Sequence, residues 1–198
     1  MEKIVGYHII FGAYGFWLPN DPRGSWSDFV GAWELFRFGQ ATRTTERRSL
    51  ARDEHDQEKR LAAKSALKLP SVLFSADQIL TVGEGIAEVV VKSQLQIWAC
   101  SIMPEHVHCV LARDRLSAEQ LSIQIKGGAT RAMVLAGNHP FLAHARTGQR
   151  PPKTWERGEW KVFLHNEGEV QKAIKYVEDN PIREGLPPQH WEFVTKLA

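Results

Sequence analysis

The amino-acid sequence predicts an α+β domain of ferredoxin-like, split βαβ topology: a central antiparallel sheet, helices on one face and an extra C-terminal helix. Two observations predict this fold. Short runs rich in apolar and β-branched residues occur near 4–14, 95–103, 106–113 and 160–164. Helical apolar periodicity separates the first run from the second, and the third from the fourth. The order is therefore β-α-β-β-α-β plus one helix, which leaves the other sheet face able to carry a site.

The overall composition is that of one globular domain. The 198 residues are 43% hydrophobic and 24% charged, with a formal net charge of +2. This charge permits a nucleic-acid partner without requiring one. Cys100 and Cys109 lie in apolar runs without CxxC spacing, which is typical of a reducing compartment. The first residues resemble no signal peptide and no run has the length of a membrane span. We therefore expect a cytoplasmic protein without a membrane partner.

The first strand, 4–14 (IVGYHIIFGAY), is followed by a loop from Trp17 that is rich in Pro and Gly. Aromatic residues in GFWLPNDPRGSWSDFVGAWELFRF could stack on unpaired bases, but they more simply anchor an irregular loop. Between Arg37 and Lys68 there are nine Lys or Arg and five Asp or Glu. A helix there, capped by Thr44 or Thr45, has too few apolar positions for the core. We expect a charged, partly helical insertion at about 19–70 in a single domain of residues 1–198.

The middle of the chain predicts a helix and a hairpin. Ser75 can cap a helix over 76–92, whose apolar stripe includes Val82, Ile86 and Val89. The strand 95–103 then stops at Pro104, and a second strand, 106–113, follows at once. The short connection predicts an antiparallel pair.

The last third predicts two helices and a strand. Ser117 and Gln120 form a potential capping box for a helix over 116–137, which Gly127 and Gly128 weaken midway. The strand is WKVFL at 160–164. We expect the final helix to cover 169–180 and to end at the Asn-Pro pair.

Two histidines lie one residue apart in MPEHVH, at 103–108. Because side chains alternate along a strand, Val107, Cys109 and Leu111 should point to the core and His106 and His108 together to the other face. Two imidazoles on one sheet face can hold a divalent ion. They can equally be polar residues on a half-exposed sheet, and this segment alone does not decide between the two.

The final helix bears on that question. Val170, Ala173 and Val177 belong to a narrow apolar stripe, and Tyr176 and Asn180 lie one turn apart on its flank. If the seam between helix and sheet opens over the two histidines, one pocket holds two imidazoles, a carboxamide and a phenol. The plainer interpretation is that tyrosine packs beside the stripe and asparagine before proline stops a helix.

Together, these motifs resemble a known family. MPEHVH after an apolar strand and YVEDNPIREGL at 176–186 are similar to the motifs of the single-tyrosine HUH transposases, most of all the REP-associated tyrosine transposases. The opening YHIIFGAYGFWLPNDPRG also resembles their N-terminal stretch. The likeness covers about 4–26 and 76–187. Glu105 departs from the usual asparagine, and it can strengthen cation binding or only face solvent. The length of the charged segment is a second departure.

The resemblance implies that His106, His108 and Asn180 hold Mg²⁺ or Mn²⁺ and that Tyr176 is the nucleophile. The implied reaction cleaves and rejoins single-stranded DNA through a 5′-phosphotyrosine intermediate, on hairpins or palindromes of the REP type. A mixed nitrogen and oxygen ligand set also accepts zinc, nickel or copper. Arg183, within the second motif, can contact DNA or brace the helix end. The other DNA-contact candidates, each also readable as a plain surface charge, are Arg23, Lys126 and Arg131.

Two alternatives stay open. A catalytically inactive or domesticated relative would still bind structured single-stranded DNA. A metallohydrolase with a His-x-His zinc site would need a third ligand, for which His8 on the first strand is the candidate. The C-terminal segment LPPQHWEFVTKLA can dock the last helix on its own domain, so a monomer is slightly favoured over a homodimer. The sequence of the target DNA, and whether the gene belongs to a mobile or a domesticated DNA element, do not follow from the amino-acid sequence.

Overall fold

The computed structural model describes residues 3–19, 33–39 and 56–197. A four-stranded sheet in the order β2-β3-β1-β4 forms its centre, with every neighbouring pair antiparallel. The strands are β1 (Gly6–Gly12), β2 (Ile97–Ile102), β3 (His106–Ala112) and β4 (Trp160–Leu164). This is the strand order of the split βαβ arrangement, so the predicted fold class is confirmed.

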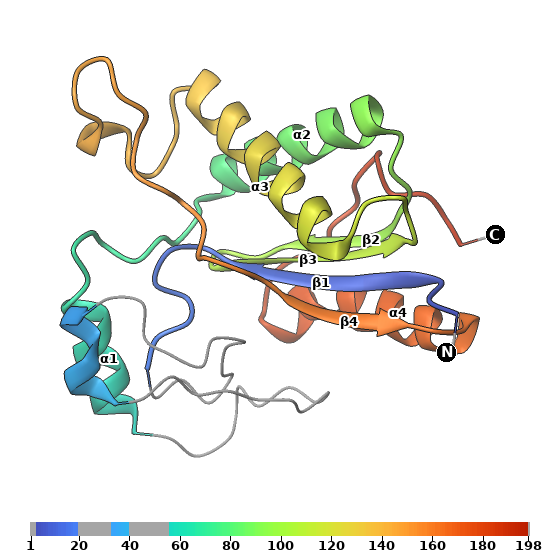
Figure 1. Cartoon of the computed structure of the whole chain (residues 1–198), viewed down its shortest axis with the longest axis horizontal. Helices are drawn as coiled ribbons and strands as arrows, with labels where there is room; N and C mark the ends of the chain where they lie inside the picture. Colours follow the sequence, from blue (N-terminus) through green and yellow to red (C-terminus); the bar gives the residue numbers. More distant parts are fainter. Residues whose placement is uncertain (1–2, 20–32, 40–55, 198) are drawn as a thin grey trace.

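Helices cover both faces of the sheet (Figure 1). One face carries α2 (Ala76–Ser93) and α3 (Ala118–Leu135), and the opposite face carries α4 (Glu167–Arg183). The main core lies between the sheet and α2 and α3, where it buries Ile9, Phe11, Val107, Cys109 and Leu111 from the strands. A smaller apolar cluster joins the other face to α4 and contains Ala99, Val110, Leu164, Val170, Ala173 and Val177. Burying one such side chain contributes about 1.5–3 kcal/mol, so both layers are firmly held.

Local sequence signals account for the helix starts. Ser75 with Gln78, and Ser117 with Gln120, form complete capping boxes at α2 and α3. Each box satisfies backbone N–H groups that have no partner inside the helix. The predicted capping box at Ser117 is therefore confirmed.

The predicted end of the last helix is wrong. Pro181 lies inside α4, which begins at Glu167 and continues to Arg183. Proline removes one N–H from the ladder, but the last turn is closed by Glu184, which donates to the carbonyls of Asn180 and Pro181. Asn180 and Pro181 are both buried, so tertiary packing outweighs the local preference against the helix before proline.

Glycines allow α2 and α3 to approach each other closely. A Cβ on Gly85 would lie 2.7 Å from the Gly128 carbonyl oxygen, and one on Gly128 would lie 2.3 Å from a methyl carbon of Val89. Gly127 has nothing within 4 Å of such a Cβ. Of the two glycines that weaken α3 locally, Gly128 is therefore required by the helix contact.

The predicted insertion at about 19–70 is described only in part. It contains a 3-10 helix, η1 (Trp33–Phe38), and α1 (Gln57–Ser65), which is capped by Asp56. The predicted caps Thr44 and Thr45 lie outside the described residues. Leu18, Leu35 and Ala63 form a satellite apolar cluster that connects these pieces. The single-domain organisation of residues 1–198 stays a prediction.

The C-terminal segment 186–197 follows the outer edge of β2. Gln189 donates to the Ile102 carbonyl and accepts from the Ile102 backbone N–H, both at 2.8 Å. Further along, the Thr195 N–H donates to the Ile97 carbonyl at 2.8 Å. Trp191 packs against α2, where it occupies the space that a Cβ on Gly83 would need. Among the described residues, no helix is long and apolar enough to cross a bilayer.

Candidate functional site

The histidine pair lies on the sheet face that carries α4. Strand alternation sends Val107, Cys109 and Leu111 into the core under α2 and α3, and His106 and His108 to the other side. The two imidazole centroids are 4.8 Å apart with an interplanar angle of 74°. Both residues are buried, at 7% and 3% exposure. The chain therefore places two imidazoles side by side at the start of β3, next to the Pro104 turn.

Tyr176 reaches the same place from α4. Its ring centroid lies 5.7 Å from that of His108 and 5.9 Å from that of His8. The half-buried ring flanks the apolar stripe that docks α4 on the sheet. Because that stripe fixes the rotation of the helix, Tyr176 is held against the histidines rather than in solvent.

Asn180 lies one helical turn beyond Tyr176 and is buried, at 7% exposure. Its side-chain Nδ2 is buried without a hydrogen-bond partner. Leaving such a polar atom unsatisfied costs about 1–3 kcal/mol, so this position suits a polar ligand. Turning the carboxamide by 180° would put its oxygen in the same place.

His8 is the third imidazole on this face. Its Nε2 lies 3.1 Å from Nδ1 of His108. Burial lowers the pKa of His8 to about 4. Burial also holds the pKa of His108 well below its usual range, with smaller contributions from His106 and His8. Both side chains are therefore neutral at pH 7, and neutral imidazole is the form that can offer a lone pair to a metal ion.

The donor set fits a divalent cation of the kind the sequence suggests. No group of three or more His, Cys, Asp or Glu side chains within the described ranges is arranged to hold a metal ion. A three-histidine zinc site, as the hydrolase alternative needs, is not formed among these residues, and the Nε2 of His8 faces His108. The remaining candidate donors are the two imidazoles and the carboxamide of Asn180, which form a mixed nitrogen and oxygen set.

Phe16 and Glu105 shape the outer end of the site. The Phe16 ring lies 4.7 Å from the His106 ring, centroid to centroid, at an interplanar angle of 30°. The Glu105 carboxylate forms an ion pair with Lys64 of α1 at 2.7 Å. The charged segment and the acidic residue before His106, the two departures from the resembled family, are thus in contact.

Three of the four predicted DNA-contact residues lie in the described part of the chain, and one of these three, Arg183, is beside this site. The Arg183 guanidinium lies 5.5 Å from the centroid of the Tyr176 ring and forms an ion pair with Asp179. Lys126 lies on the core face, where it donates to the carbonyls of Glu156 and Gly158.

Arg131 is not beside the site either. Arg131 pairs with Glu88 across α3 and α2, on the opposite side of the sheet, and Arg23 lies outside the described residues. Among the three candidates that the structure describes, the geometry therefore favours Arg183 as a DNA contact near Tyr176.

Three polar or aromatic residues of this site carry no strong sequence signal. Ser101 is the cross-strand partner of His108, is buried, and has an Oγ without a hydrogen-bond partner. His8 and Phe16 come from the first strand and the loop after it, about 100 residues before His108. Strand pairing brings them here. His8 is already a candidate in the sequence, where the alternation of the first strand sends it away from the core, whereas no such signal marks Phe16.

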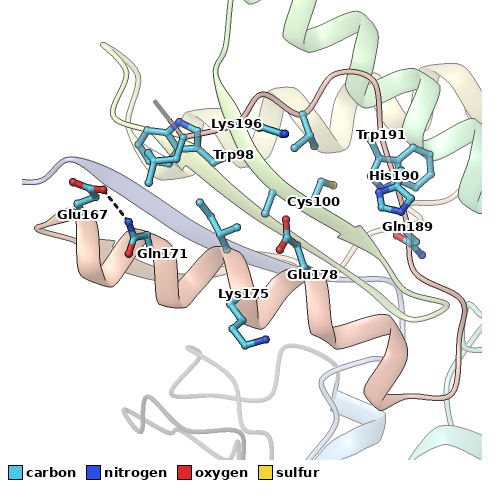
Figure 2. Close-up of a pocket in the computed structure, with 14 residues that line it drawn as sticks. Trp98, Cys100, Glu167, Gln171, Lys175, Glu178, Gln189, His190, Trp191 and Lys196 are labelled. Atoms are coloured by element: carbon cyan, nitrogen blue, oxygen red, sulfur yellow. Dashed lines mark hydrogen bonds between the residues drawn. The ribbon is translucent and has the colours of Figure 1, made fainter.

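A separate groove of about 610 Å³ lies on the other flank of α4 (Figure 2). It is bounded by α4, β2 and the C-terminal segment, with Trp98, Glu178 and Trp191 among its lining residues. The helical rotation of about 100° per residue puts its α4 lining residues on the side away from Tyr176. The groove and the histidine site are therefore distinct places.

Comparison with known proteins yields likenesses only among solved structures. No protein-family model matches the chain, and no curated protein matches it. A structure of a REP-associated tyrosine transposase bound to a REP hairpin is 13% identical with a TM-score of 0.48, covering 94% of this chain and 73% of its own. A crystal structure of a putative transposase from Deinococcus radiodurans R1 is 13% identical with a TM-score of 0.41, covering 90% of this chain and 92% of its own. At these values the likenesses assign neither a family nor an activity to this chain.

Proposed function

We propose that this chain is a metal-dependent single-stranded DNA endonuclease and strand transferase with Tyr176 as its nucleophile. One observation carries the proposal: a helix from the end of the chain holds the Tyr176 ring 5.7 Å from the His108 ring of a mid-chain strand. The two sequence motifs that resemble HUH transposases are thereby neighbours in space. A core-packing role alone does not explain a phenol, two imidazoles and a buried carboxamide gathered on one sheet face.

The chemical step is a transesterification. The Tyr176 hydroxyl loses its proton to solvent and the phenolate oxygen attacks the DNA phosphorus. The bond from phosphorus to the 3′ oxygen breaks, and this oxygen takes up a proton to leave as a 3′-hydroxyl. The DNA stays bound through a 5′-phosphotyrosine bond, which a second 3′-hydroxyl can attack in the reverse reaction. Strands are exchanged without an external energy source.

Two charges would assist this step. A free phenol has a pKa of about 10, so only about one in a thousand is ionised at pH 7. The Arg183 guanidinium, which lies 5.5 Å from the centroid of the Tyr176 ring, would offset part of the negative charge of the DNA phosphate. Mg²⁺ or Mn²⁺ held by His106, His108 and Asn180 would polarise a non-bridging phosphate oxygen.

The substrate class follows from the sequence resemblance. Hairpins or palindromes with single-stranded flanks are the proposed DNA, and one of the solved structures above was determined with a REP hairpin. Such hairpins are therefore the first substrates to try. An inactive relative that only binds this DNA is the alternative that the same experiment separates.

The test is covalent capture on a pool of 3′-labelled hairpins with randomised single-stranded flanks, in Mg²⁺ or Mn²⁺. A 5′-phosphotyrosine keeps the 3′ portion of the strand on the protein, so an active enzyme gives a labelled band that survives denaturing detergent. We expect this band for the wild type and none for Tyr176→Phe, while hairpin affinity changes less than about threefold. Tyr7→Phe is the matched control, because Tyr7 is a buried phenol on the core face.

Two results would count against the proposal. A band retained by Tyr176→Phe would show that another residue is the nucleophile. Hairpin binding by the wild type without any band, in either metal, would favour the binding-only alternative.

A further inference from the structure

We propose that His8 is a positioning residue that fixes the tautomer of His108, so that His108 presents the lone pair of its Nε2 to the cation site. This inference rests on the proposed function insofar as the cation is the one that His106 and His108 would hold. It assigns to His8 a role that is neither ligand nor nucleophile.

The placement of His8 follows from strand pairing. His8 is the partner of Val110 across β1 and β3, and His108 is the partner of Ile10. Both histidines project from the same sheet face on neighbouring strands, two residues apart in register. Their rings therefore meet diagonally, with centroids 5.3 Å apart and His8 Nε2 facing His108 Nδ1 at 3.1 Å.

A contact of this kind holds one proton between two nitrogens. If His108 donates from Nδ1, the Nε2 of His8 accepts and the Nε2 of His108 keeps its lone pair. If His8 donates instead, His108 must carry its own proton on Nε2 and cannot bind a metal ion through that atom. Only the first arrangement is compatible with His108 as a ligand, and it matches the outer hydrogen bonds that ligating histidines make elsewhere.

Packing keeps the pair in this geometry. His8 and His108 are buried, at 8% and 3% exposure, and the Tyr176 ring lies within 6 Å of both ring centroids. A buried nitrogen that loses its partner costs about 1–3 kcal/mol, so the contact is expected to persist before any cation binds. The tautomer of His108 is then set in the metal-free protein.

Nitrogen-15 NMR of histidine-labelled, metal-free protein reads the tautomer directly and needs neither DNA nor activity. We expect the wild type to show His108 protonated on Nδ1 and bare on Nε2, with the resonances assigned from single histidine variants. His8→Gln keeps an acceptor in reach of Nδ1 and should preserve this pattern. His8→Leu removes the acceptor and should shift His108 towards the other tautomer.

Calorimetric titration with Mn²⁺ provides the second measurement. Loss of an outer partner commonly weakens metal affinity 10- to 100-fold, so we expect that loss in His8→Leu and less than about threefold in His8→Gln. His139→Gln is the matched control, because His139 is buried and its Nε2 lies 2.7 Å from the Thr154 hydroxyl, away from the site. It should leave both readouts unchanged.

Several outcomes overturn the inference. A wild-type His108 protonated on Nε2 would refute it without any variant, even if His8→Leu fails to fold. Unchanged tautomer and affinity in a folded His8→Leu would do the same. Coupling between bound ¹¹³Cd²⁺ and a His8 nitrogen would make His8 a ligand instead. Failure of the proposed function would give a different result. His108 would be protonated on Nδ1 and Mn²⁺ would bind, but no covalent protein–DNA adduct would form.

Discussion

The Phe16 ring lies 4.7 Å from the His106 ring, centroid to centroid, and packs against the backbone of Gly12. Gly12 is the cross-strand partner of His106. A Cβ on Gly12 would lie 2.6 Å from the Phe16 ring. Because Gly12 has no side chain, the Phe16 ring can pack there, and it contacts one face of the His106 imidazole.

Gly12→Ala is expected to displace Phe16 and release the orientation of His106. Overpacking of this kind costs about 1–3 kcal/mol of unfolding free energy. We expect Mn²⁺ affinity to fall about tenfold or more, measured by calorimetric titration, because a ligand that can rotate binds less well. Phe16→Leu should lower the affinity in the same direction without the clash. An unchanged affinity in both folded variants would show that Phe16 does not position His106.

Arg183→Gln should weaken DNA attachment at the tyrosine more than the same change at Arg131. Arg183 lies beside the Tyr176 ring, whereas Arg131 pairs with Glu88 on the other side of the sheet. Removing a phosphate contact also lowers the salt dependence of binding by about one unit of slope. The measurements are adduct formation rate and hairpin affinity at several salt concentrations. Equal losses in the two variants would contradict a local role for Arg183.

Gly128→Ala is expected to destabilise the fold, while Gly127→Ala is not. A methyl group on Gly128 would meet Val89 and the Gly85 backbone, and one on Gly127 meets open space. The first change should cost about 1–3 kcal/mol, and the second should gain up to about 1 kcal/mol from helix propensity. Denaturant unfolding of the paired variants measures both. A stable Gly128→Ala would mean that α2 and α3 separate at little cost.

Stability of the metal-free protein should fall as the pH drops below about 6.5. Burial lowers the pKa of His8, His108 and His139, so these residues stay neutral when folded and take up a proton on unfolding. The unfolded state then binds more protons, and each such histidine removes about 1.4 kcal/mol per pH unit until its folded pKa is reached. For His8 that limit is about 4.

Unfolding free energies between pH 4 and 8, in the presence of a chelator, measure this slope. His139→Gln should remove the part of this pH dependence that His139 contributes, without changing the histidine site. A flat profile between pH 4.5 and 6.5 would contradict the buried, neutral state of these side chains.

Short-range patterns predicted much of this molecule. The period of two along 106–113 was enough to put His106 and His108 on one face, and the stripe of α4 was enough to put Tyr176 on its flank. Ser117 and Gln120 marked a helix start because a capping box is contained within four residues. Each of these features depends on neighbours in sequence.

Long-range contacts were the part that the sequence did not show. The His8 contact with His108 spans 100 residues and depends on the register of β1 against β3. Lys126 looked available for DNA, but the loop before β4 folds over it and supplies carbonyl partners. Pro181 looked like a helix stop because packing of α4 on the sheet is invisible to a local rule.

Gln189 and Thr195 occupy backbone groups on the outer side of β2, and this limits how copies of the chain can meet. A sheet can continue from one molecule into another only if its edge strand has unpaired backbone N–H and C=O groups. At β2 the C-terminal segment 186–197 already bonds some of these groups. Any such continuation would have to start from β4, the other outermost strand. Cutting the chain after Leu186 should therefore expose the backbone groups of β2 and increase self-association through this strand, which size-exclusion chromatography of the intact and truncated chains would measure.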